Sequence, residues 1–169
     1  MPRPVSLEIR PVRNGRGIVA LRPFAPGELV WRLRGKAVRP AAVWRWWDSD
    51  PRRAANCIRF GDELFLDTRG DFGEFANHAC RPNAGLFKER GTLALRAIRR
   101  IAAGAEVTHD YSTYIGADDV WTMRCNCGER GCRGRVRRFD QLPAATLARY
   151  RREGLIPAFI LRTANSISS

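Results

Sequence analysis

Three cysteines crowd into one short stretch, and their spacing suits a metal site better than a disulfide. Cys125, Cys127 and Cys132 form the pattern CxCx4C. A disulfide between cysteines two positions apart would close a small strained ring, and a cytosolic chain keeps its thiols reduced. A closed structural zinc site needs four ligands, so this pattern is one short. Cys57, Cys80 or a histidine must supply the fourth, with Cys80 the natural donor; three buried free thiols, or a disulfide and a spare thiol, are the alternatives.

The segment FANHACRPN at 75–83 places an amide, an imidazole and a thiol side by side. Asn77, His78 and Cys80 lie within four positions, in a stretch without the apolar period of a helix. Such a loop can serve a metal ion through Cys80 and a small ligand through Asn77. For His78, a packed core histidine is the alternative to a functional one.

The composition predicts one soluble domain with a strong positive charge. The chain has 169 residues, with 30 basic and 17 acidic side chains and a net charge of +13. That length is enough for one domain with a core. It contains no apolar run of membrane-spanning length and no secretory signal, so we expect a cytoplasmic protein. The charge leaves two interpretations open, contact with nucleic acid or a solvated surface.

The apolar pattern predicts short strands before residue 115 and helical structure near the C-terminus. The strand candidates are rich in β-branched and aromatic residues and are separated by Gly, Pro or Asp. They are SLEIRPV, GIVAL, ELVWRL, CIRFGDELFL and TLALRAI. We expect a short helix at 41–51 that stops at Pro51, with its three tryptophans as packing groups. A C-terminal helix would start at an Asp140 cap and end at Gly154, before a polar tail.

Four segments together resemble SET-domain protein lysine methyltransferases with a post-SET zinc motif, of a minimal bacterial type. They are NGRGIVALRPFAPGELV (14–30), FANHACRPN (75–83), AGAEVTHDY (103–111) and CNCGERGCRG (125–134). The resemblance covers residues 5–138. It implies a mainly β fold of small twisted sheets with a pseudo-knot. The implied organisation is a SET domain at 5–115, a post-SET zinc segment at 120–138, and a C-terminal helix and tail at 139–169.

The resemblance also implies the activity and the site residues. The chain would transfer a methyl group from S-adenosylmethionine to a lysine side chain of a protein, with Tyr111 as the catalytic residue. The residues implied to bind the cofactor are Asn14, Gly15, Arg16, Gly17, Asn77, His78, Tyr111 and Asn126. The residues implied to hold one structural zinc ion are Cys80, Cys125, Cys127 and Cys132.

Two departures from the family pattern leave the lysine channel and the product undefined. Many relatives place an aromatic residue ahead of the DY pair, where it often decides how many methyl groups are added; here that residue is His109. A tyrosine that often lines the channel in relatives falls near Asn56 or Cys57. These departures keep open a catalytically inactive SET scaffold, and the charge keeps open a zinc-containing nucleic-acid-binding protein.

The charge bears on the partner. An enzyme at +13 should repel a lysine-rich substrate, unless nucleic acid or a nucleic-acid-associated protein presents it. In that case the protein would be nucleoid-associated. The arginines expected to contact the polyanion flank the cysteine knuckle; they are Arg124, Arg130, Arg133, Arg135, Arg137 and Arg138.

Overall fold

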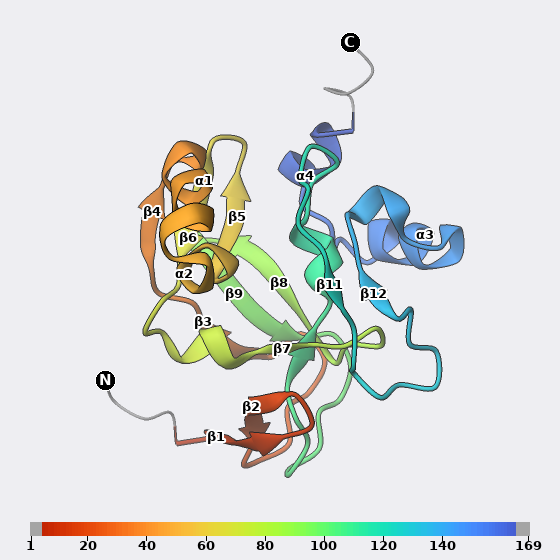
Figure 1. Cartoon of the computed structure of the whole chain (residues 1–169). Coiled ribbons are helices and arrows are strands. Elements are labelled where there is room, and N and C mark those ends of the chain that lie inside the picture. The colour runs from red at the N-terminus through yellow and green to blue at the C-terminus, as the bar shows by residue number, and fades with distance from the viewer. Residues whose placement is uncertain (1–4, 165–169) are drawn as a thin grey trace.

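The computed structural model describes residues 5–164, which form five small β-sheets and several short helices (Figure 1). The prediction of a mainly β fold built from small sheets is confirmed. The strands are β1 (Leu7–Val12), β2 (Gly15–Ala20), β3 (Leu29–Arg32), β4 (Lys36–Val38), β5 (Cys57–Gly61), β6 (Leu64–Asp67), β7 (Asn77–His78), β8 (Ala84–Glu89), β9 (Thr92–Ala97), β10 (Thr108–His109), β11 (Met123–Arg124) and β12 (Arg135–Val136). Most of the predicted tail lies outside the described residues.

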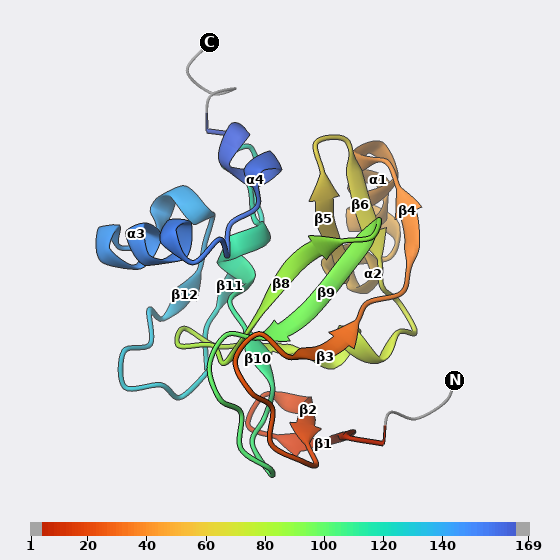
Figure 2. The same cartoon turned by 180° about the vertical axis from the view of Figure 1, so that it is seen from behind.

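Two antiparallel three-stranded sheets form the body of the molecule. One has the strand order β3-β9-β8 and the other β4-β6-β5, and Figure 2 shows the first of them from the front. The β1–β2 hairpin stands apart as a separate two-stranded sheet and turns at Gly15, whose φ of +92° favours glycine. Within residues 5–164 no helix is long and apolar enough to cross a membrane.

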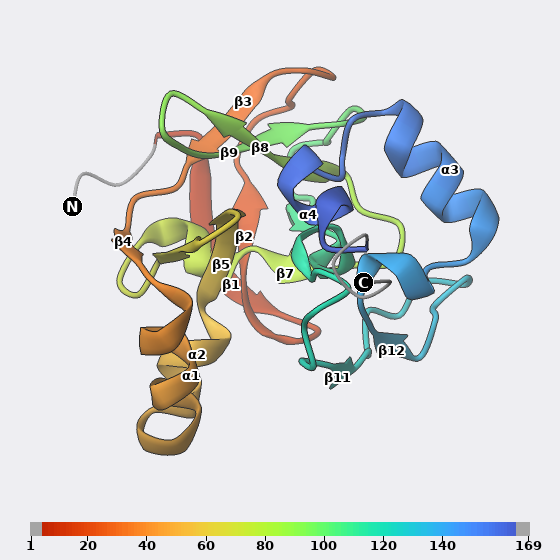
Figure 3. The ribbon, with the colours of Figure 1, turned by 90° about the horizontal axis from the view of Figure 1, so that it is seen from above.

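The helices are short. They are α1 (Pro40–Ser49), α2 (Pro51–Ala55), α3 (Ala144–Arg152) and α4 (Ala158–Arg162), with the 3-10 turns η1 (Phe72–Phe75), η2 (Tyr111–Tyr114) and η3 (Phe139–Gln141). The helix predicted at 41–51 is α1. Pro51 follows its end and also begins α2, because proline is tolerated at the first position of a helix. Figure 3 shows α1 and α2 on one side of the molecule and α3 and α4 on the other.

The C-terminal helix begins later than the sequence predicted. Asp140 lies in η3 and does not cap a helix, and α3 starts directly after Pro143. Proline disfavours a helical conformation in the residue before it, so Leu142 is extended and the helix cannot extend back to Asp140. The predicted end is close to the observed one, since Gly154 follows α3 with a φ of +65°.

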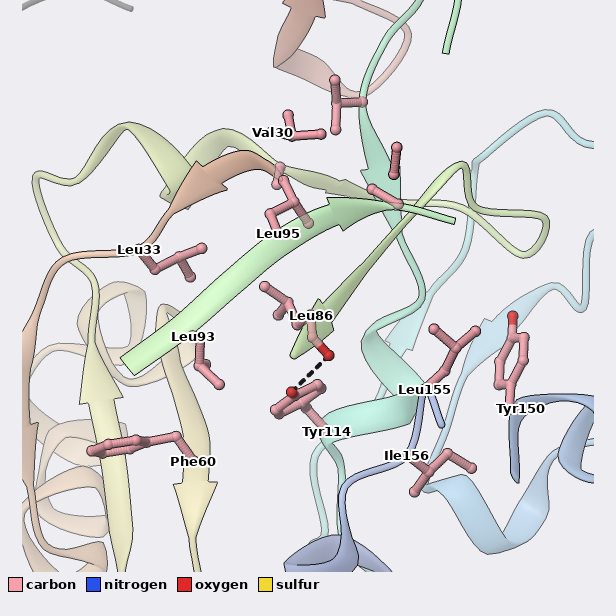
Figure 4. Close-up of a cluster of buried hydrophobic side chains, with 14 of the residues drawn as sticks. Val30, Leu33, Phe60, Leu86, Leu93, Leu95, Tyr114, Tyr150, Leu155 and Ile156 are labelled. Atoms are coloured by element: carbon pink, nitrogen blue, oxygen red, sulfur yellow. Dashed lines mark hydrogen bonds between the residues drawn. The ribbon is translucent and has the colours of Figure 1, made fainter. Parts of the chain in front are cut away.

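The main hydrophobic core joins the central sheet to the C-terminal elements. Leu86, Leu93 and Leu95 of β8 and β9 are buried, and Tyr150 and Ile156 pack against the same core from the C-terminal region (Figure 4). The hydroxyl of the buried Tyr114 donates to the carbonyl of Leu86 at 2.8 Å. The C-terminal region is therefore part of the core and not an appendage to it.

One parallel strand pair brings distant segments together. β7 and β10 pair with Asn77 opposite Thr108 and His78 opposite His109, and the Ala79 N–H extends the pairing to the His109 carbonyl at 3.1 Å. These are the two segments that the predicted pseudo-knot would cross. The pairing places the NHAC and THDY motifs side by side.

Candidate active site and metal centre

Asn77 connects the THDY segment to the β1–β2 hairpin. Its side-chain amide donates to the Arg16 carbonyl at 3.0 Å and to Glu106 Oε1 at 2.8 Å. Gly17 lies against the same two side chains, because an added Cβ would come 2.9 Å from the Asn77 amide nitrogen and closer still to Glu106. Only glycine fits there without displacing them, so the hairpin backbone reaches Asn77.

The other predicted cofactor-binding residues lie around this hairpin. Asn14 and Arg16 are exposed, and the Arg16 guanidinium lies over the Phe75 ring. Asn126 in the cysteine knuckle is linked to the hairpin because its carbonyl accepts from Arg13 Nε at 2.9 Å. The hairpin thus contacts both Asn77 and the knuckle, and the residues predicted to bind the cofactor gather on one side of β7.

His78 is a buried, neutral histidine that joins the tyrosine segment to the cysteines. Its Nδ1 accepts from the backbone N–H of Tyr111 at 3.2 Å, so Nε2 carries the ring proton. That nitrogen lies 3.4 Å from Cys80 Sγ and donates to it. Burial lowers the pKa of His78 to about 4, although Asp110 acts in the opposite direction. The side chain therefore has a structural role.

Tyr111 sits at the start of η2 with its hydroxyl held in place. The hydroxyl donates to the Ala76 carbonyl at 3.0 Å, and the ring packs between His78, His109 and Trp121. Burial raises the pKa of Tyr111 to about 12, so the hydroxyl stays protonated at neutral pH. Its oxygen keeps lone pairs free to accept weak contacts from a bound ligand.

His109 lies beside Tyr111, with 4.8 Å between the ring centroids, and is 6% exposed. Burial, together with the nearby His78, lowers the pKa of His109 to about 3, so the ring is neutral. Its Nδ1 is buried and has no hydrogen-bond partner among the described residues. A polar atom in this state is costly unless a ligand or water pairs with it.

Tyr111 and His109 line a cleft of about 800 Å³ that opens to solvent. Asn56 and Cys57 also line it, where the sequence left the channel undefined. Cys57 is a half-buried thiol whose pKa is raised to about 12, mainly by burial. The remaining walls come from α1 and from the segment before β11.

Two of the three tryptophans of α1 are not core residues. Trp44 and Trp47 line the cleft, and Trp44 is 44% exposed. The expectation that all three are packing groups is therefore wrong for Trp44. Helical spacing alone could not separate these roles, because the cleft opposite α1 is built from β5 and from residues 119–121, which are distant in sequence.

The four cysteines implied as zinc ligands form one cluster. The sulfur atoms of Cys80, Cys125, Cys127 and Cys132 all lie within 4.8 Å of one another. Cys125 Sγ lies 3.7 Å from Cys80 Sγ and 3.5 Å from Cys132 Sγ. A tetrahedral zinc ion with Zn–S bonds of about 2.3 Å requires sulfur separations of about 3.8 Å. The donor set and spacing therefore fit a structural zinc site.

Backbone groups support this cluster. The Arg133 N–H points at Cys80 Sγ and the Gly134 N–H at Cys132 Sγ, each at 3.4 Å. Burial raises the pKa of the Cys80 thiol to about 11, so that thiolate needs nearby positive charge to form. Cys57 lies outside the cluster.

Asp110 is the buried centre of a polar network that sequence reasoning missed. Its carboxylate accepts two bonds from Arg133, at 2.6 and 2.8 Å, and one from the Tyr150 hydroxyl at 2.9 Å. It also accepts from the Ser112 N–H at 3.0 Å. Burial alone would raise the pKa of Asp110, but the contacts with Arg133 hold it below the usual value. The network joins the THDY segment, the knuckle and α3.

This network corrects the expected role of one arginine. Arg133 was predicted to contact nucleic acid, but its side chain is only 14% exposed and pairs with Asp110. Arg138 also has a partner, since it pairs with Asp140 at 3.0 Å. Four of the predicted contact arginines stay exposed: Arg124, Arg130, Arg135 and Arg137.

Comparison with known proteins identifies the family. The SET domain model matches residues 15–112, and the chain belongs to the SET domain family. It is 30% identical over 131 residues to histone-lysine N-methyltransferase trithorax of Drosophila virilis, covering 71% of this chain and 3% of that protein. It is 28% identical over 141 residues to the H3 lysine-4 specific histone-lysine N-methyltransferase of Debaryomyces hansenii, covering 78% of this chain and 13% of that protein. The chain thus spans a small part of these relatives.

Proposed function

We propose that this chain is an S-adenosylmethionine-dependent protein-lysine N-methyltransferase. The observation that carries the proposal is the position of Tyr111, at the base of an open cleft and next to the paired NHAC segment. The similar proteins of Debaryomyces hansenii and Drosophila virilis are named as histone-lysine N-methyltransferases. That similarity supports a lysine side chain of a protein as the substrate.

The cleft floor favours the neutral amine that the reaction requires. A lysine with a pKa near 10.4 must lose its proton, which costs about 4.6 kcal/mol at pH 7. Burial raises the pKa of Tyr111 and lowers that of His109, so the floor disfavours charge of either sign. The same environment lowers the pKa of a lysine ammonium group that enters it.

The chain's own residues then position the reactants. S-adenosylmethionine, when bound, supplies the methyl group as an electrophile. Asn77 and the hairpin backbone at Arg16 and Gly17 would hold that cofactor, and Tyr111 would orient the methyl group through weak C–H···O contacts. An aligned amine and methyl group about 3 to 3.5 Å apart supply most of the remaining rate enhancement.

We also assign one structural zinc ion to the four-cysteine cluster. Cys80 ties the ion to the NHAC segment, and the Nε2–H of His78 donates to the Cys80 sulfur. The ion would therefore hold the knuckle, with Asn126, against the cofactor side of the site. Its role is structural, because all four positions of a tetrahedral ion are filled by protein.

Tritiated S-adenosylmethionine and a mixed-protein substrate test the activity. Tyr111→Phe should lower methyl transfer by at least about a hundredfold if the hydroxyl acts mainly in the transition state, with little change in cofactor affinity. Tyr114→Phe is the matched control, since its hydroxyl also donates to a backbone carbonyl but lies in the core (Figure 4). Equal rates for Tyr111→Phe and wild type would refute the assignment, and an inactive wild type that binds the cofactor would favour the inactive scaffold.

A second role, contact with nucleic acid, is supported by the arginines that remain exposed. Arg124, Arg130, Arg135 and Arg137 make no ion pair within residues 5–164. Each phosphate that they neutralise should add about 0.9 to the salt dependence on duplex DNA. Binding to random duplex DNA across a salt series measures this slope, and a flat dependence with no stimulation of methyl transfer would leave the charge as a solubility feature. Positive results would also favour a nucleoid-associated location.

A further inference from the structure

A second groove continues the catalytic cleft toward the surface. It has a volume of about 440 Å³ and lies between the β5–β6 hairpin and the loop at 118–119. Trp44, Arg59, Phe65 and Asp119 line both the groove and the cleft. A polypeptide that places a side chain beside Tyr111 can therefore place a neighbouring side chain in the groove, since an extended chain advances about 3.3 Å per residue.

The groove is acidic although the chain is strongly basic. Four carboxylates line it, and Arg59 is the only basic residue that does; the carboxylates belong to Asp62, Glu63, Asp118 and Asp119. Arg59 is occupied, because it pairs with Asp118 at 2.6 Å and also donates to the carbonyls of Gly61 and Asp62. The groove therefore concentrates negative charge on a protein with a net charge of +13.

Two of these carboxylates have no cationic partner. Asp62 is paired with Arg162 at 2.8 Å, whereas Glu63 and Asp119 make no ion pair within the described part of the chain. Asp119 Oδ1 accepts from the Trp121 N–H at 2.7 Å, which fixes the carboxylate in place. Burial raises the pKa of Asp119, and the charge of Asp118 acts in the same direction. A cation placed between Glu63 and Asp119 would relieve this repulsion.

Independent features of the cleft also point to a cationic hydrogen-bond donor. The Nδ1 of His109 is buried at the cleft floor without a partner and lacks a donor. At the junction of cleft and groove, Trp44 is 44% exposed and offers an aromatic face. Aromatic faces attract cations, and arginine stacks on them more often than lysine does.

We propose that the groove binds an arginine side chain of the substrate, close in sequence to the lysine that enters the cleft. The guanidinium would lie between the carboxylates of Glu63 and Asp119 and against Trp44. The inference rests on the proposed methyltransferase function and names the substrate class, a lysine with a flanking arginine. It also shows how a basic protein can accept a basic peptide, because the local charge at the entrance is negative.

Peptide binding tests the inference without requiring turnover. Fluorescent Gly-Ser peptides with one central lysine carry arginine at each flanking position in turn, and citrulline replaces arginine in the neutral counterparts. Anisotropy is measured with S-adenosylhomocysteine present. We expect one register in which the arginine peptide binds about tenfold more tightly than its citrulline counterpart, as for a partly buried ion pair. In Glu63→Gln/Asp119→Asn this ratio should fall below about twofold.

A charge-matched variant separates local from global effects. Asp48→Asn/Glu153→Gln also removes two negative charges, from exposed carboxylates that line neither the cleft nor the groove. It should keep the tenfold preference. No preference in wild type, or equal loss of preference in both double variants, would overturn the inference. Methyl transfer to the same peptides is scored separately, so that binding preference without turnover would count against the proposed function alone.

Discussion

Replacing Arg133 with methionine would leave the Asp110 carboxylate buried without its counter-ion. The Asp110 side chain is 1% exposed, so water cannot replace the guanidinium. Methionine keeps much of the length and apolar contact of the arginine stem, so the substitution removes mainly the charge and the bidentate bonds.

The expected loss of stability is large. Removing one partner of a buried ion pair costs about 3 to 5 kcal/mol, because the other charge stays buried. Tyr150 and Ser112 still donate to Asp110, so we expect a value near the lower end, about 3 kcal/mol. With a urea dependence of about 2 kcal/mol/M, the unfolding midpoint should fall by about 1.5 M.

Arg138→Met is the matched control, because Arg138 pairs with Asp140 while both side chains are 31% exposed. Removing this exposed pair should cost less than about 1 kcal/mol. Urea unfolding, with zinc kept in excess, is followed for wild type and both variants. In Arg133→Met/Asp110→Asn the lone charge is absent, so this double variant should be more stable than Arg133→Met alone. Equal midpoints for Arg133→Met and Arg138→Met would refute the reasoning.

Three further outcomes are expected. Elemental analysis should find one zinc ion per chain, and Cys80→Ser with Cys132→Ser should lose it; zinc retained in that double variant would contradict the assignment. The methylation rate should rise with pH through a single ionisation, that of the substrate lysine, since the pKa values of His109 and Tyr111, about 3 and about 12, lie outside the range from pH 6 to 10; a second ionisation in that range would count against neutral His109. Gly17→Ala should weaken binding of S-adenosylmethionine, measured by calorimetry, because the new Cβ would displace Glu106 and Asn77; unchanged affinity would place the cofactor elsewhere.

The sequence predicted those parts of the site that depend on local spacing. The CxCx4C pattern and the nearby Cys80 predicted a metal cluster, and the structure brings these four thiols together. The alternating apolar runs predicted the small sheets for the same reason, because the period of a strand is visible within a few residues.

The contacts that the sequence did not predict join distant residues. Arg133 and Tyr150 both bind Asp110, from 23 and 40 positions away, and no spacing rule relates them. Arg133 was assigned to the surface because its neighbours are arginines that do lie there. Trp44 was assigned to the interior because an amphipathic helix does not reveal whether its apolar face meets a core or a cleft.

The β7–β10 pairing also bears on how the chain folds. Two short parallel strands far apart in sequence gain few hydrogen bonds to offset the entropy of closing the loop between them. The β8–β9 hairpin lies within that loop and pairs Ala84 with Ala97, so its formation brings the ends of the loop close together. Hairpins form within microseconds, before most long-range pairings. The hairpin thus acts as a scaffold for assembly, and the strands carrying Asn77 and His109 can meet at little further entropic cost.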